Sequence, residues 1–278
     1  MNRKTWLITG AARGLGAHIA RAALAAGDNV VATARNVETA RSAFSEHTER
    51  LLVFPLDVTS ASGTQAAVDA SIARFGTIDV LVNNAGYGHL GIFEESSADD
   101  LQRQFETNVF GLATMTRAVL PTLRRQRSGH IINIGSVGGL VGFDLCTLYG
   151  MSKFAVEGFS VNLARDVAPL GIHVTVVEPG HFRTDFLDDS SARFSGNPID
   201  DYEEVRSKVE SAYRSFNHQQ LGDPAKLGTA VVQVAHAETP PLHLLLGSDA
   251  IETVRNDLKK RLVEIEAWER LSISTDHR

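Results

Sequence analysis

Three residues with complementary acid–base chemistry lie near one another in the middle of the chain. Tyr149 and Lys153 are four residues apart, and Ser136 precedes the tyrosine by thirteen positions. Residues four apart share one face of a helix, so the ammonium group would lie beside the phenol and lower the tyrosine pKa by favouring the phenolate. This spacing predicts a tyrosine that acts as a general acid and base near neutral pH.

A glycine-rich turn near the start of the chain predicts a dinucleotide site. Gly10, Gly14 and Gly16, with Leu15 between the last two, lie between an expected strand and an expected helix. Glycine allows a sharp turn and the close approach of a pyrophosphate. The helix N-terminus adds N–H groups and the positive end of its dipole.

The residues after the second expected strand indicate which dinucleotide is bound. An NAD site usually has a carboxylate there for the ribose 2′-hydroxyl, but residues 31–36 contain none and include Arg35. A guanidinium suits a 2′-phosphate, and Arg13 in the glycine turn could bind the same phosphate. The sequence therefore predicts NADP(H), with solvated surface arginines as the alternative interpretation.

Two further strand ends are expected to contact the cofactor. Asp57 and Val58 follow the third expected strand, and the Asp57 carboxylate could accept a hydrogen bond from the adenine amine. Asn84, Ala85 and Gly86 follow the fourth, and small residues there would allow the ribose to pack closely. Asp and Asn-x-x-Gly sequences are also common at the ends of strands, so ordinary turns are the alternative interpretation of both segments.

Taken together, these motifs resemble those of the short-chain dehydrogenase/reductase family, and in detail its hydroxysteroid- and retinol-dehydrogenase-like branch. The matching residues occur in family order over about residues 5–185: Thr9, Gly10, Gly14, Gly16, Asn83, Asn84, Ala85, Gly86, Asn108, Gly135, Ser136, Tyr149, Lys153, Pro179, Gly180 and Thr184. The resemblance implies a catalytic tetrad of Asn108, Ser136, Tyr149 and Lys153. It also implies cofactor contacts from Tyr149, Lys153, Pro179, Gly180 and Thr184.

The implied activity is NADP(H)-dependent hydride transfer to or from a ketone, an aldehyde or a secondary alcohol. Tyr149 would exchange the proton, Ser136 would orient the substrate oxygen, and Asn108 would hold a water linked to Lys153. An apolar substrate is expected from the residues predicted to line its pocket: His89, Leu90, Val137, Phe143, Tyr149, His181, Phe182, Phe186 and Leu187. An NAD-dependent alcohol dehydrogenase and a non-catalytic NADP-sensing regulator are the alternatives.

Alternating apolar runs and amphipathic stretches predict one α/β domain over residues 1–278, a Rossmann-type doubly wound fold with a seven-stranded parallel sheet and helices on both faces. The strands are expected at Thr5–Thr9, Asn29–Thr33, Leu51–Leu56, Val80–Asn83, His130–Gly135, His173–Glu178 and His243–Leu246. Residues 186–221 are predicted to form a substrate lid, since a polar segment with one apolar stripe needs something to cover. A surface excursion is the alternative. Residues 249–278 are predicted to form a helical tail.

Composition limits the partners and the compartment. The 278 residues are 43% hydrophobic with a net charge of −6, which disfavours nucleic acid and anionic membranes, and no apolar run reaches the roughly 18 residues of a membrane span. Cys146 is the only cysteine, which suits the cytoplasm, and the ten histidines lack metal-site spacing. Apolar residues on the expected helices over 99–125 and 153–168 predict a homodimer.

Overall fold

A seven-stranded parallel sheet forms the centre of the protein, as predicted. The computed structural model describes residues 3–44, 49–188 and 191–277. Strand order is β3-β2-β1-β4-β6-β7-β9, with every neighbouring pair parallel. The strands are β1 (Thr5–Ile8), β2 (Asn29–Ala34), β3 (Leu51–Pro55), β4 (Val80–Asn83), β6 (Gly129–Ile134), β7 (Ile172–Pro179) and β9 (His243–Leu246).

Side chains alternate between the two faces of this sheet, and each face has its own core. Trp6 and Ile8 of β1 pack into one core with residues of α1 and α8, whereas Leu7 between them packs into the other with residues of α3 and α5. This period of two is the geometry of an extended strand. Because both faces are covered, the strands are mostly apolar and not alternately polar.

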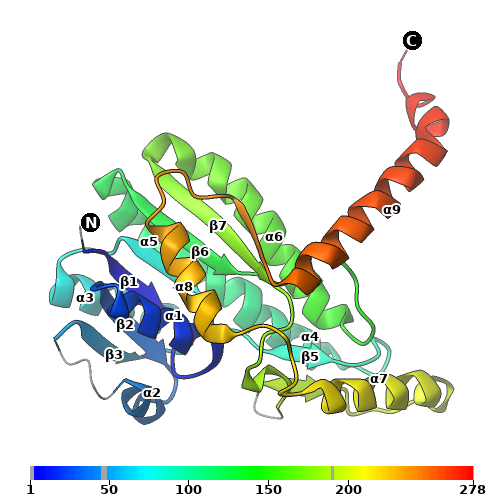
Figure 1. Ribbon diagram of the computed structural model, residues 1–278, viewed down its shortest axis with the longest axis horizontal. Helices are drawn as coiled ribbons and strands as arrows, with labels where there is room; N and C mark the ends of the chain where they lie inside the picture. The colour runs from blue at the N-terminus through cyan, green and yellow to red at the C-terminus, as the bar shows by residue number, and fades with distance from the viewer. Residues whose placement is uncertain (1–2, 45–48, 189–190, 278) are drawn as a thin grey trace.

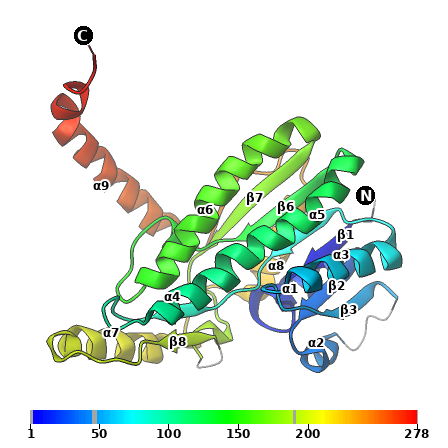
Figure 2. The same cartoon turned by 180° about the vertical axis from the view of Figure 1, so that it is seen from behind.

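Helices cover both faces of the sheet, as Figures 1 and 2 show from opposite sides. The helices of the sheet layers are α1 (Gly14–Ala25), α2 (Val37–Ala43), α3 (Ala61–Phe75), α4 (Ala98–Phe105), α5 (Leu112–Gln126), α6 (Thr147–Val167) and α8 (Pro224–Ala235). α1 packs on α8 on one face, and α3 packs on α5 on the other. Asp223 caps α8 through its side chain, and Pro224 occupies the first turn, as the sequence indicates.

The long helix expected over 99–125 is divided in the structure. A π-helical segment, Glu106–Gly111, separates α4 from α5. Among the residues expected to form an apolar face for a dimer, Met115 and Val119 are fully buried in the core against the sheet, whereas Phe154 of α6 is 43% exposed, and the homodimer stays a prediction.

The segment predicted as a lid contains a strand and a helix. β8 (Ala192–Phe194) pairs in parallel with β5 (Gly88–Leu90), and α7 (Glu203–Phe216) follows. Neither β5 nor β8 was expected from the sequence. Figures 1 and 2 place α7 across the end of the molecule where α4 and β5 lie. Residues 189–190 of the predicted lid lie outside the described residues.

The chain ends in a long helix that leaves the body. α9 (Ser248–Ile273) contacts the body in its N-terminal part, as far as Arg261, which donates to the Leu140 carbonyl, and Figure 1 shows its C-terminal part projecting away. Ala250 and Val254 pack against Val137 in a small core. Among the described residues, no helix is both long enough and apolar enough to span a bilayer.

Candidate active site

The turn from β1 to α1 places a helix N-terminus at one end of a cavity. Gly10 and Gly14 have positive φ angles of 65° and 55°, which glycine adopts most readily. The N-cap residue Arg13 makes no capping hydrogen bond with its side chain. A Cβ atom on Gly14 would meet no atom within 4 Å. Open space before a helix N-terminus suits a pyrophosphate group.

The turn after β4 is bonded to this glycine turn. Asn84 Nδ2 donates to the carbonyl oxygens of Thr9 (2.9 Å) and Gly10 (3.0 Å), and Thr9 Oγ1 accepts from the backbone N–H groups of Asn84 and Ala85 (3.0 Å each). A Cβ atom on Gly16 would lie 2.4 Å from Asn84 Nδ2. Gly16 therefore allows the two turns to pack together and does not line the cavity, although it was expected to contact the cofactor.

The neighbouring ends of β2 and β3 form the far end of the cavity. Arg35, Asn36 and Asp57 all line it. Asp57 Oδ1 accepts from the Thr59 backbone N–H at 3.0 Å and from Thr59 Oγ1 at 2.8 Å. The backbone hydrogen bond, with help from the charge of Arg35, lowers the pKa of Asp57, so this carboxylate stays ionised beside the guanidinium.

A single cavity of about 660 Å³ connects these turns to the middle of the chain. It is lined by every predicted catalytic and cofactor residue except Gly16 and Asn108: Gly10, Arg13, Gly14, Leu15, Arg35, Asp57, Val58, Asn84, Ala85, Gly86, Ser136, Tyr149, Lys153, Pro179, Gly180 and Thr184. Residues that follow strands from β1 to β7 thus meet at one edge of the sheet. Ligands of open α/β sheets bind at this edge, beyond the carboxyl ends of the strands.

Ser136, Tyr149 and Lys153 meet in the middle of this cavity. Ser136 directly follows β6, and its Oγ accepts from the Gly138 backbone N–H at 3.0 Å. Tyr149 lies in the first turn of α6. One turn later, Lys153 Nζ donates to the Ile134 carbonyl at 2.7 Å and lies 5.7 Å from the centre of the tyrosine ring.

Burial, and not the neighbouring ammonium, dominates the ionisation of the tyrosine. Removal from water raises the pKa of Tyr149 above its usual range, and the hydrogen bond with Ser136 opposes this only in part. Burial also lowers the pKa of Lys153 to about 8. The prediction that Lys153 lowers the tyrosine pKa is therefore not met in this structure, since the desolvated cleft disfavours both charged forms.

Asn108 lies in the π-helical segment, a type of irregularity frequent at functional sites. Its Oδ1 accepts from the Tyr87 backbone N–H at 3.1 Å, and its Nδ2 donates to the Tyr87 carbonyl at 2.9 Å and to Ser152 Oγ at 3.2 Å. The side chain therefore fixes the loop after β4 against α6. A water held by Asn108 would have to be bound mainly by its backbone carbonyl.

The substrate end of the cavity is more polar than the sequence indicated. Eight of the nine residues predicted to line the substrate pocket do so, and the exception is His89, a buried residue of β5. Arg103 and Arg193 also line the cavity, although no arginine pair was expected there. Arg103 lies 2.6 Å from Asp100 Oδ1, and the Arg193 guanidinium lies over the ring of Tyr87. Only tertiary contacts bring these two arginines to one site, so spacing could not reveal them.

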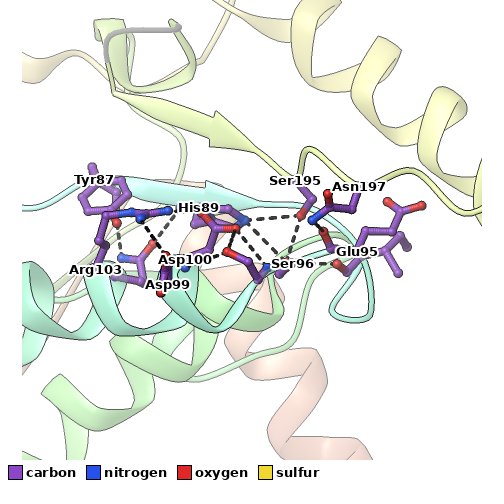
Figure 3. Close-up of polar contacts among 12 residues, drawn as sticks. Tyr87, His89, Glu95, Ser96, Asp99, Asp100, Arg103, Ser195 and Asn197 are labelled. Carbon is purple, nitrogen blue, oxygen red and sulfur yellow. Dashed lines mark hydrogen bonds and ion pairs between the residues drawn. The ribbon is translucent and has the colours of Figure 1, made fainter.

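The predicted lid is bonded to the body at several points. Figure 3 shows His89 beside Ser96 and Ser195, with His89 Nε2 3.3 Å from Ser195 Oγ and the two serine hydroxyls 2.9 Å apart. Beyond them, the buried carboxylate of Glu95 pairs with Arg206 of α7. Burial lowers the pKa of His89, so a neutral imidazole joins β5 to the segment after β8.

A second polar cluster lies apart from the cavity residues. His243 Nδ1 lies 2.9 Å from Glu178 Oε1 and 3.1 Å from Glu157 Oε1, and one ligand atom from each residue falls within 4.8 Å of the others, close enough to hold a metal ion. Burial, together with the charge of Glu178, raises the pKa of Glu157 to about 7. A proton can therefore satisfy this cluster near neutral pH, and the absence of a metal stays a prediction.

Comparison with known proteins identifies the family. The family model described as short chain dehydrogenase matches residues 4–193. This chain belongs to the short-chain dehydrogenase/reductase family. It is 38% identical to oxidoreductase BOA17 of Botryotinia fuckeliana over 98% of this chain and 99% of that protein. The crystal structure of a short-chain dehydrogenase from Streptomyces avermitilis has a TM-score of 0.92 and 40% identity, covering 99% of this chain and 100% of that one. The chain is therefore an oxidoreductase with a nicotinamide-cofactor fold.

Among the solved relatives, one has NADP bound and another has NAD bound. ElxO with NADP bound is 27% identical with a TM-score of 0.75, covering 90% of this chain and all of that one. A family member from Burkholderia phymatum in complex with NAD is 25% identical with a TM-score of 0.79, covering 94% of this chain and 95% of that one. Family membership alone does not distinguish NADP from NAD, and the residues at the end of β2 must make that distinction.

Proposed function

We propose that this protein is an NADP(H)-dependent oxidoreductase that reduces an apolar ketone or aldehyde, or oxidises the matching secondary alcohol. The observation that carries the proposal is one continuous cavity. It has Ser136, Tyr149 and Lys153 at its centre, an open helix N-terminus beside them, and Arg35 at its far end. A bound nicotinamide would supply or accept the hydride.

The protein's own residues handle the proton and the substrate oxygen. Ser136 Oγ is positioned to orient the carbonyl oxygen, and Tyr149 gives that oxygen its proton. Because burial raises the tyrosine pKa, the phenol is protonated at neutral pH, which is the form that donates a proton when a carbonyl is reduced. Lys153 lies on the β6 side of the catalytic centre, where its ammonium group donates to the Ile134 carbonyl.

The choice of NADP(H) rests on the residues around the end of β2. Arg35 and Asn36 line the cavity after Ala34, and Arg13 lines it from the glycine turn. A 2′-phosphate would find one or two guanidinium groups there, each charge-assisted hydrogen bond contributing about 1.5–3 kcal/mol. The carboxylate of Asp57, which also lines this end of the cavity, follows β3 and is already bonded to Thr59.

Substitution of Arg35 tests this choice. In Arg35→Asp we expect kcat/KM for NADPH to fall at least about tenfold relative to kcat/KM for NADH. The matched control is Arg41→Asp, which alters an exposed arginine of α2 whose partner is Glu38 and should preserve the wild-type ratio. Equal kcat/KM for both cofactors in the wild-type enzyme would contradict the NADP(H) assignment.

The substrate class follows from the walls beyond Tyr149. Phe143, Phe182, Phe186 and Leu187 provide an apolar surface. A panel of apolar ketones, each paired with an analogue that carries a terminal carboxylate, shows whether Arg193 also binds substrate. Apolar members should give the higher kcat/KM, and a consistent preference for the carboxylates would replace this proposal with an anionic substrate.

A further inference from the structure

The exposed apolar surface of the protein is concentrated on α9. Every residue from Leu258 to His277 is exposed, and the large apolar side chains among them include Leu258, Leu262, Ile265 and Trp268, the last two 64% exposed. The helix has 26 residues and is therefore about 39 Å long. Figures 1 and 2 both show that its C-terminal half contacts no other element. Most helical stability in proteins comes from packing of an apolar face, so this half needs a partner.

The apolar residues of α9 include one continuous stripe, and the C-terminal part of that stripe is exposed. Ile251, Leu258, Leu262 and Ile265 follow one another at steps of seven, four and three residues, which places them on one side of the helix. Val254 lies on the same side of the helix, three residues after Ile251 and four before Leu258, and it is buried against the body near the point where Arg261 donates to the Leu140 carbonyl. From Leu258 onward, beyond the contact with the body, the stripe is exposed.

The charged residues beside the stripe would pair with opposite charges if two copies of the helix packed antiparallel. Lys259 and Glu266 lie seven residues apart on the same flank, and Arg255 and Glu269 lie farther out toward the two ends. In an antiparallel pair related by a twofold axis near Leu262, Lys259 of each copy faces Glu266 of the other. Arg255 then faces the region of Glu269. Flanking charges of this kind set partner and orientation in paired helices.

We propose that α9 is an interaction surface for a second copy of this chain, with two α9 helices packed antiparallel through the Leu258–Ile265 stripe. The interface is isologous, because the same residues serve both copies. A membrane surface fits less well, since Glu264, Glu266 and Glu269 would lie near anionic lipids.

Charge reversal tests both the surface and its orientation in the full-length protein. Sedimentation velocity should show a dimer for the wild type at about 10 µM. Lys259→Glu and Glu266→Lys should each weaken association at least about tenfold, because each places like charges together twice in the dimer. The double variant K259E/E266K should recover wild-type association. Lys260→Glu, the same change on the opposite side of the helix, is the matched control and should remain dimeric.

Three results would overturn the proposal. The first is a wild-type protein that is monomeric at 50 µM, including one that instead sediments with anionic phosphatidylserine vesicles. The second is a dimer that neither single variant weakens, which would place the interface elsewhere. The third is loss of association in both single variants without recovery in the double variant, which would exclude the antiparallel pairing.

Discussion

The ring of Phe186 lies against the ring of Tyr149, with centroids 5.4 Å apart and planes tilted by 55°. Phe186 belongs to the segment between β7 and β8, so the segment predicted as a lid directly contacts the proposed acid. An apolar ring at this place helps to keep water from the phenol, and burial is what raises the tyrosine pKa. The lid and the catalytic centre therefore form one unit.

Phe186→Ala should impair catalysis with bulky apolar ketones more than with small ones. The aromatic pair contributes about 0.5–1.5 kcal/mol beyond simple burial, so we expect an increase in KM of up to about tenfold for bulky substrates, with NADPH affinity nearly unchanged. Steady-state kinetics on a size series measures this. Phe93→Ala removes an exposed ring that does not line the cavity and should leave every KM unchanged. Equal effects on small and bulky ketones would contradict a lid role for Phe186.

Lys153→Met should abolish most turnover and raise thermal stability in a pH-dependent way. The folded-state pKa of Lys153 is about 8, below the ordinary 10.5, so the unfolded chain binds more protons between these values. The cost of burying the ammonium is complete below pH 8 and fades as the pH rises toward 10.5. The substitution should therefore raise Tm at pH 7 and have a smaller effect at pH 10. A Tm gain that is the same at both pH values would contradict this assignment.

Glu157→Gln should stabilise the protein above neutral pH. The folded-state pKa of Glu157 is about 7, above the ordinary 4.5, so the folded state binds more protons between pH 4.5 and 7 and the wild type loses stability as pH rises through that window. A neutral amide avoids this loss. We expect a gain on the order of 1 kcal/mol at pH 8, allowing for screening at the exposed His243 side, and little gain at pH 4.5.

Chemical unfolding at both pH values checks the Glu157 prediction. Glu210→Gln, a change at a partly exposed position of α7 outside this cluster, is the control and should show no such pH dependence. Destabilisation by Glu157→Gln at pH 8 would indicate that the ionised carboxylate is needed there, as it would be for a bound cation at the Glu157–Glu178–His243 cluster.

Local patterns were enough to predict the sheet and most of the site. The expected strand ends fall within about one residue of the observed ones, because buried parallel strands are continuous apolar runs. Tyr149 and Lys153 share one face of α6, as their spacing indicates. In both cases the decisive interactions are local or repeat along the chain.

The remaining features depend on contacts between distant segments. The pairing of β5 with β8 joins strands of three residues each, about a hundred residues apart, and short polar strands have no distinct pattern. Met115 was expected on an outer face because an apolar stripe alone does not say which side meets the sheet. The tyrosine pKa depends on how completely Tyr149 is buried, which no spacing reveals.

The central claim is that Tyr149 supplies the proton while the rest of the cavity binds the cofactor. Single-turnover reduction of a ketone substrate by the NADPH complex of Tyr149→Phe tests it most directly, because this change removes only the hydroxyl. We predict a rate at least about 100-fold below wild type, with the dissociation constant for NADPH, measured by fluorescence on the same samples, within about twofold of wild type. A single-turnover rate close to wild type, with NADPH still bound, would contradict the account.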